Sequence, residues 1–230
     1  MPGPGPGRSG HRAGPSVTAG RRLVLLRHGE TTHNAAGIWQ GQLDVPLNDH
    51  GRVQAAAAAV ALATRPVARI VSSDLVRAAE TAHIVAEVLG RPVALDARFR
   101  EIEAGQWQGR TSAEVQAAHP ELWAAVLRGE DVPRGVTGET MADVARRGAQ
   151  GVTDVLAATA SGERVLVVTH GAACRAIVAD LLGLDVQSAW RILGGLGNCH
   201  WAELVEGGLG WRVATWNIGP AVPADGADLA

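Results

Sequence analysis

Leu23-Val-Leu-Leu-Arg-His-Gly-Glu30 joins a short apolar run to a group of polar residues, and Val165-Leu-Val-Val-Thr-His-Gly171 repeats this arrangement far along the chain. Four consecutive apolar residues are typical of a strand that is buried on both faces. Strands of this kind occur in parallel sheets that helices cover. The two stretches therefore predict an α/β protein in which two buried strands end in the same type of polar sequence.

Similar strand-like runs alternate with helical patterns along the rest of the chain. Strands are expected at 22–26, 69–72, 92–95 and 164–169, and helices at about 49–63, 75–89, 139–160 and 172–183. The alternation predicts three layers, with a mostly parallel central sheet and helices on both faces. Residues 100–138, with their Gly, Pro and Trp, read as short helices inserted over one end of the sheet.

A different pattern follows residue 195, where Asn198–Val205 and Gly210–Asn217 flank the turn-forming sequence Glu-Gly-Gly-Leu. This pattern predicts an antiparallel hairpin at the C-terminal edge of the sheet. The exposed edge expected beside the hairpin is compatible with a homodimer.

Composition limits the classes of protein that the chain can belong to. Of its 230 residues 47% are hydrophobic and 19% charged, which is enough apolar surface for a sizeable core. All 21 basic residues are Arg and the net charge is −2, which disfavours nucleic-acid binding and excludes chemistry that needs a Lys amine. No apolar run is long enough to predict a membrane-spanning helix.

Both ends of the chain differ from its middle. Residues 1–20 alternate Pro and Gly without the apolar core of a signal peptide, and 219–230 are again rich in Pro, Gly and Asp. We expect a disordered N-terminal tail, a single domain over 21–218 and a flexible C-terminal tail. The same observations lead us to expect a cytoplasmic protein.

The two histidines that follow the buried strands are the first candidates for a functional site. Ligands of parallel α/β sheets bind beyond the carboxyl ends of the strands, so His28 and His170 could be neighbours there. The chain turns at Gly29, which would allow both Arg27 and His28 to face one pocket. Each His could instead simply satisfy a turn, or the pair could bind a metal ion. A guanidinium beside His28 repels a cation, so an anion such as phosphate fits this sequence better.

Two further segments add a cation and a carboxylate. Arg77 is expected in the first turn of a helix capped by Ser73 or Asp74, where the helix dipole disfavours a cation unless an anion binds there. The alternative is an ordinary solvated Arg. Glu101 lies between a strand and a loop containing Gly and Trp, where a carboxyl group could serve in acid–base chemistry.

Taken together, these segments resemble the histidine phosphatase superfamily, also called the phosphoglycerate mutase-like family. The matching segments occur in the same order as in that family and span residues 23 to about 185. It rests on Arg27-His28-Gly29-Glu30-Thr31, Asn34, Gln40-Gly41, Leu47 to Gly51, Ser73-Asp74-Leu75 with Arg77, Ala78 and Thr81, Glu101 with Gly105 and Gly109, and His170-Gly171.

The resemblance implies a phosphomonoesterase that forms a phosphohistidine at His28, with Glu101 as general acid and then general base. It also implies that the phosphate pocket and the adjoining substrate site are formed by Arg27, Arg77, His170, Asn34, Gln40 and Gly171. It implies neither a metal nor an organic cofactor, and its partner would be a small phosphorylated substrate.

The segment Leu193–Asn217, with its Gly-rich start and its Trp residues, resembles family members that hydrolyse glucosyl-3-phosphoglycerate. This predicts a small phosphorylated sugar or sugar-acid as substrate. The alternatives are a broad-specificity acid phosphatase, a phosphoglycerate mutase and a non-catalytic phosphate-binding regulatory protein. The absence of Lys and the short segment between Glu101 and His170 favour hydrolysis over mutase action.

A few other residues admit two interpretations. Trp39 and Trp107 could stack on a carbohydrate or belong to the core. Cys174 could be a thiol of low pKa or a small buried residue. Finally, Arg110, Arg128 or Arg134 could bind a carboxylate of the substrate, although each could instead be a solvated surface residue.

Overall fold

The centre of the protein is a six-stranded sheet with the order β3-β2-β4-β1-β5-β6. The structure, a computed structural model, describes residues 20–220. The strands are β1 (Arg22–Arg27), β2 (Arg69–Ser72), β3 (Val93–Leu95), β4 (Arg164–Thr169), β5 (Trp201–Gly207) and β6 (Gly210–Ile218). The first four are parallel, and β5 and β6 form the antiparallel hairpin at one edge. The predicted fold class is confirmed. Most of the predicted tails, 1–20 and 219–230, lies outside the described residues.

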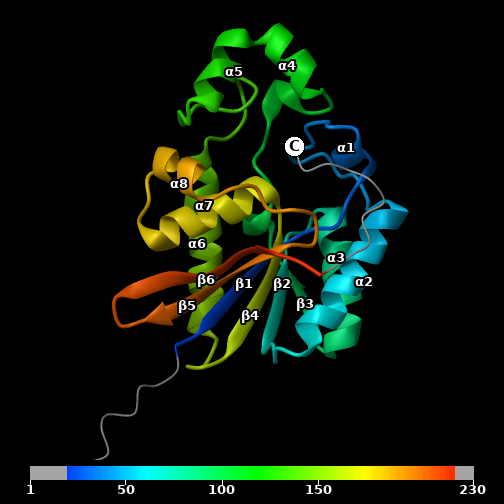
Figure 1. Ribbon diagram of the computed structural model, residues 1–230, viewed down its shortest axis with the longest axis vertical. Helices are drawn as coiled ribbons and strands as arrows, with labels where there is room; N and C mark the ends of the chain where they lie inside the picture. The colour runs from blue at the N-terminus through cyan, green and yellow to red at the C-terminus, as the bar shows by residue number, and fades with distance from the viewer. Residues whose placement is uncertain (1–19, 221–230) are drawn as a thin grey trace, which may run out of the picture.

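Helices cover both faces of this sheet (Figure 1). They are α1 (Thr32–Ala35), α2 (Asp49–Ala63), α3 (Val76–Leu89), α4 (Ser112–Ala118), α5 (Pro120–Leu127), α6 (Met141–Ala157), α7 (Gly171–Leu182) and α8 (Val186–Ile192), with short 3-10 turns η1 (Ala97–Phe99) and η2 (Gly105–Trp107). None of the helices within residues 20–220 is both long enough and apolar enough to cross a membrane.

Alternation along β1 and β4 divides the core into two halves, because successive side chains of a strand point to opposite faces. Leu23 and Leu25 of β1 pack with residues of α6 and α7, whereas Val24 and Leu26 pack with residues of α2 and α3. All four side chains are fully buried. Helices cover both faces of the strand, so every side chain of this run is buried, which explains why the run is apolar throughout.

The segment between β3 and α6 lies beyond one end of the sheet, where α4 and α5 stand apart from the other helices (Figure 1). A cluster of tryptophans holds it together: Trp107 is fully buried and contacts Trp39 and Trp123 edge-on, with ring centroids 5.0 and 6.0 Å apart. The predicted insertion is confirmed, and Trp107 belongs to its core rather than to a stacking surface for sugars.

Some predicted boundaries are wrong. The helix α3 has Leu75 as its N-cap without a side-chain cap, so neither Ser73 nor Asp74 caps it. Asp74 instead forms an ion pair with Arg100. The strand β5 begins at Trp201 rather than Asn198, because the chain turns at Cys199, whose φ is +56°.

Truncation of Leu25 tests the importance of the central strands. Leu25→Ala should lower the free energy of unfolding by about 2–5 kcal/mol, because it leaves a cavity between β1 and the helices α6 and α7. Val60→Ala, at a position on α2 that is 67% exposed, should change it by less than about 0.5 kcal/mol. Chemical denaturation measures both values, and equal losses would contradict this description of the core.

Candidate active site

The carboxyl ends of β1 and β4 bring the two candidate histidines together. Arg27 is paired with Thr169 in the parallel register, so the residue that follows each strand emerges at the same level. The ring centroids of His28 and His170 are 5.0 Å apart, with the ring planes inclined at 60°. Both side chains are buried. The sequence-based prediction that they are neighbours is therefore correct.

Hydrogen bonds define the protonation of His28. Its Nδ1 lies 2.6 Å from the carbonyl oxygen of Gly29, which can only accept a hydrogen bond. The guanidinium Nε of Arg77 donates to Nε2 across 3.3 Å. The ring therefore carries its proton on Nδ1 and keeps a lone pair on Nε2. Burial first, and then the charges of Arg77 and Arg27, hold the pKa of His28 well below its usual value, so the ring is neutral.

Arg77 is an integral part of the buried site. It lies in the first turn of α3 and its side chain is fully buried. Its two terminal nitrogens donate to the carbonyl oxygens of Leu43 and Gly41 at 2.7 and 2.8 Å. Burial lowers its pKa to about 10, so it stays a cation at neutral pH. The alternative of a solvated surface Arg is wrong.

Two buried polar atoms of the site have no hydrogen-bond partner within residues 20–220. They are Nε of Arg27 and Nδ1 of His170. Other atoms of these side chains are bonded: Nη1 of Arg27 donates to the carbonyl of Leu196, and Nε2 of His170 lies 2.9 Å from the Ser73 hydroxyl. Because buried polar atoms are nearly always paired in native proteins, these two atoms are available to bind a ligand, and Arg27 is the one that lines a cavity.

Glu101 is held at the N-terminus of α7. Its Oε1 accepts the backbone N–H groups of Ile102 at 2.9 Å and Ala173 at 3.0 Å, and its Oε2 accepts that of Ala172 at 3.1 Å. A helix N-terminus offers unpaired N–H groups and a positive dipole to such a carboxyl group. Oε2 makes only one of these bonds, so it retains capacity to contact a ligand.

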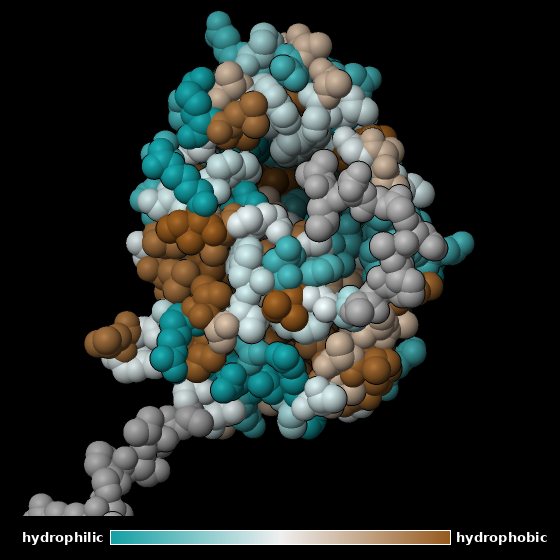
Figure 2. Space-filling view, in the orientation of Figure 1, coloured by the Kyte–Doolittle hydropathy of each residue, from teal (hydrophilic) through white to brown (hydrophobic). Residues whose placement is uncertain are grey.

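These groups surround one cavity of about 300 Å³, which is at the small end of the range for ligand pockets. The surface is hollowed beneath the helices α4 and α5 (Figure 2). Of the predicted site residues, those that line the cavity are Arg27, His28, Asn34, Gln40, Arg77 and Glu101. His170 contacts His28 but is not among the lining residues, and neither is Gly171, the first residue of α7.

Asn34 and Gln40 are joined through Thr31. The Thr31 hydroxyl lies 3.0 Å from the side-chain oxygen of each, so one hydroxyl links both cavity-lining amides. Asn198 was not predicted as part of this group. Its side-chain amide donates to the carbonyl of His28 at 3.0 Å and lies 3.4 Å from the side-chain oxygen of Asn34. A position 170 residues from His28 gives no local signal of this contact.

Several alternative candidates do not reach the cavity. Arg110 and Arg128 are exposed, Arg134 is buried against the carbonyl of Val132, and none of them lines it. Cys174 is fully buried and burial raises the pKa of its thiol, so of the two interpretations the small buried residue is confirmed and the low-pKa thiol is wrong. Within residues 20–220, no three His, Cys, Asp or Glu side chains are grouped so that they could hold a metal ion.

The fold and this constellation define the class of protein. Residues 23–219 match the profile of the histidine phosphatase superfamily (branch 1), and the chain belongs to that family.

Its curated relatives include two differently named groups. Glucosyl-3-phosphoglycerate phosphatase of Mycolicibacterium vanbaalenii is 42% identical over 226 residues, which cover 89% of this chain and 98% of the relative. A probable phosphoglycerate mutase of Erwinia tasmaniensis is 31% identical over 197 residues, 86% of this chain and 90% of the relative. Among solved structures, a mycobacterial glucosyl-3-phosphoglycerate phosphatase in complex with VO3 is similar, with a TM-score of 0.80, 41% identity and coverage of 86% and 98% of the two chains.

The neutral histidines make stability depend on pH. Burial holds the pKa of both His28 and His170 well below the usual 6.5, so the unfolded chain binds more protons than the native protein as the pH falls. The free energy of unfolding should therefore decrease from about pH 7 to pH 5, with a slope approaching about 1.4 kcal/mol per pH unit for each histidine. His28→Asn should reduce this slope by the amount that one histidine contributes. Urea denaturation at several pH values measures it, and an unchanged slope would contradict the assignment of a neutral His28.

Proposed function

We propose that the protein is a phosphomonoesterase that transfers the phosphoryl group of its substrate to His28 and then to water. The observation that supports this most directly is the lone pair on Nε2 of a neutral His28, placed beside Arg77 in the cavity. A neutral imidazole is a nucleophile, whereas an imidazolium is not. The adjacent guanidinium supplies positive charge where the equatorial phosphoryl oxygens would lie.

The first half-reaction forms the phosphohistidine. Nε2 of His28 attacks phosphorus, the P–N bond forms and the bond between phosphorus and the leaving oxygen breaks. Glu101, in its protonated form, gives its proton to that leaving oxygen, so an alcohol departs. The Nδ1–H of His28 keeps its bond to the Gly29 carbonyl, which stabilises the positive charge that the ring acquires.

The second half-reaction returns the site to its initial state. The Glu101 carboxylate takes a proton from water as the water oxygen attacks phosphorus, and the P–N bond breaks. The electron pair returns to Nε2 and inorganic phosphate leaves. During both steps we propose that the phosphoryl group and adjoining substrate are bound by Arg27, Arg77, His170, Asn34, Gln40 and Gly171. The unpaired Nε of Arg27 and Nδ1 of His170 support the first and third of these assignments.

The similarity to relatives named glucosyl-3-phosphoglycerate phosphatase leads us to propose this sugar-acid phosphate as the substrate. The relatives named as probable phosphoglycerate mutases make mutase action the second candidate. A mutase must hold a second phosphate group, and the only cations that line this cavity within residues 20–220 are Arg27 and Arg77. We therefore favour hydrolysis.

Substrate choice is tested by measuring phosphate release from glucosyl-3-phosphoglycerate, 3-phosphoglycerate, a hexose phosphate and an aryl phosphate. The proposal predicts the highest kcat/KM for glucosyl-3-phosphoglycerate. Hydrolysis of all four at similar rates would instead indicate a broad-specificity phosphatase, and conversion of 3-phosphoglycerate to its 2-isomer would indicate a mutase. No turnover of any of them would favour a non-catalytic phosphate-binding protein.

Replacement of His28 tests the nucleophile. His28→Ala removes the only group proposed to accept the phosphoryl group, so we expect kcat to fall by at least about 10⁴-fold on every substrate. His83→Ala, at an exposed position of α3, is the matched control and should retain full activity. Wild-type kcat in the His28 variant would rule out the phosphohistidine route.

Replacement of Glu101 tests the general acid. Glu101→Gln should lower kcat/KM for alkyl phosphates by about 10²–10⁴-fold, and far less for aryl phosphates, because a good leaving group needs little protonation. The control is Glu121→Gln, an exposed carboxylate on α5. Equal losses on alkyl and aryl phosphates would count against this role.

A homodimer and a cytoplasmic location stay predictions. The strand β6 forms the edge of the sheet, and both Leu209, in the turn just before it, and its last residue Ile218 are exposed, which supports pairing of two copies along this edge. Analytical ultracentrifugation of the wild-type protein would test the dimer.

A further inference from the structure

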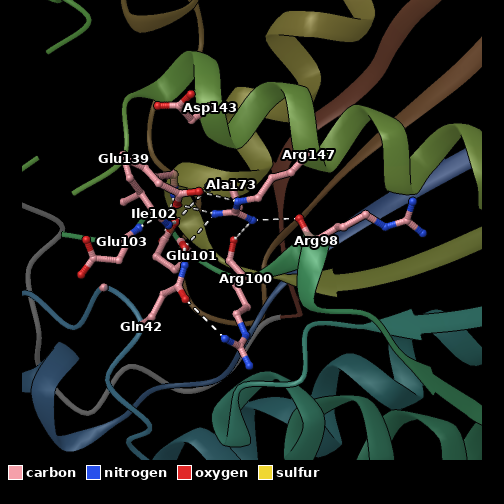
Figure 3. Close-up of polar contacts among 12 residues, drawn as sticks. Gln42, Arg98, Arg100, Glu101, Ile102, Glu103, Glu139, Asp143, Arg147 and Ala173 are labelled. Atoms are coloured by element: carbon pink, nitrogen blue, oxygen red, sulfur yellow. Dashed lines mark hydrogen bonds and ion pairs between the residues drawn. The ribbon is translucent and has the colours of Figure 1, made fainter. Parts of the chain in front are cut away.

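Arg147 of α6 lies at the centre of a polar network around the segment that contains Glu101 (Figure 3). Its Nη1 donates to the carbonyl oxygens of Arg98 and Arg100 at 2.8 and 2.6 Å. Its Nη2 donates to the carbonyl oxygen of Glu101 itself at 2.9 Å. One guanidinium therefore binds three backbone carbonyls within four residues of chain.

The same guanidinium forms a two-point ion pair with Glu139, which stands just before α6. Nε and Nη2 of Arg147 each lie 2.9 Å from a different carboxylate oxygen of Glu139. Glu139 in turn accepts the backbone N–H of Glu103, and its own N–H donates to the Glu103 carbonyl, both at 2.9 Å. Arg147 and Glu139 thus hold the chain on both sides of Glu101.

The local backbone explains why such a support is needed. Residues 100–104 lie between the 3-10 turns η1 and η2 and belong to no helix or strand. They lack the regular ladder of hydrogen bonds that would otherwise fix a backbone. The planar fork of an Arg provides several donors in one rigid geometry, which a Lys ammonium does not. Both members of the pair are mostly buried, with side chains 19% and 24% exposed, so solvent screens the interaction only in part.

Proton transfer demands such precision. A general acid must approach the leaving oxygen to hydrogen-bond distance, and a displacement of about 1 Å can cost on the order of 10²-fold in rate. The Glu101 carboxyl group is held by N–H groups of α7, whereas its backbone is held from α6. The two helices are also packed against each other.

We propose that Arg147, fixed by Glu139, is a positioning residue that keeps Glu101 in place for proton transfer to the leaving group. The proposal rests on the proposed phosphomonoesterase function and on the role of Glu101 as its general acid. Arg147 itself does not line the cavity, so it acts through Glu101 and not on the substrate. It follows that loss of Arg147 should impair proton transfer more than attack by His28.

The test compares Arg147→Lys and Glu139→Gln with the wild type on an alkyl phosphate and an aryl phosphate. Both variants keep a hydrogen-bonding side chain of similar size but lose the two-point ion pair. We expect kcat/KM for the alkyl phosphate to fall about 10- to 100-fold and that for the aryl phosphate to fall less than about threefold. The control is Arg146→Ala, the adjacent residue on α6, whose side chain is 74% exposed and should leave both values unchanged.

A general loss of structure would lower both activities together, so the ratio of the two substrates separates positioning from folding. Circular dichroism and thermal unfolding are recorded for each variant. Arg147→Ala with added guanidinium chloride at millimolar concentration provides a second readout, because guanidinium should restore the alkyl reaction selectively. Equal losses on both substrates, or no loss on either, would overturn the proposal.

A double-mutant cycle shows whether Arg147 acts through Glu101. In the Glu101→Gln background, Arg147→Lys should produce no further change in the alkyl-to-aryl ratio. A further loss of the same size as in the wild type would contradict the proposal. If Glu101→Gln alone leaves the ratio unchanged, the acid role of Glu101 fails; if only the Arg147 variants leave it unchanged, the positioning role fails.

Discussion

The parallel pairing of β1 with β4 is the constraint on which the site depends. It places Arg27 beside Thr169, and each strand is followed at once by a His. Arg22 and Arg164 precede the two apolar runs, so a register shift of one residue would bring a charged side chain into a buried position. The apolar runs and the distance between the histidines are therefore specified together. Burial of Leu25 and Val167 against the layer formed by α6 and α7 therefore also determines the 5.0 Å separation of the imidazoles.

The charge of the site is a second consequence of this architecture. The buried guanidinium of Arg77 and the partly buried one of Arg27 approach two neutral imidazoles, and Glu101 carries the only carboxyl group among the lining residues that the structure describes. Burial lowers the pKa of both Arg27 and Arg77, which means that their positive charge disfavours the folded state. A dianionic phosphate would relieve that cost. The site is thus less stable without its ligand than with it, as expected where binding depends on preorganised charge.

The sequence predicts the parts of this protein that depend on local patterns. The strand Arg69–Ser72 follows from its β-branched residues and the helix Asp49–Ala63 from the helix-forming composition of its Ala run, and both are found within the predicted bounds. His28 and His170 could be placed because each directly follows a buried strand. The contacts of Asn198 and Arg147 could not be predicted, because each joins segments that are tens of residues or more apart in sequence. The cap of α3 was mispredicted because Asp74 pairs with Arg100, a tertiary contact that overrides its local preference.

The central claim is that His28 accepts the phosphoryl group, and a direct test is to trap it there. Wild-type protein and Glu101→Gln are mixed with an aryl phosphate and quenched in alkali, which preserves a P–N bond, and the peptide that contains His28 is examined by mass spectrometry. The account predicts a phosphoryl group on His28 that is lost in acid, and more of it in the Glu101 variant, in which activation of water is impaired. Phosphate on His170 or on a hydroxyl group, or continued turnover without any phosphorylated His28, would contradict the account.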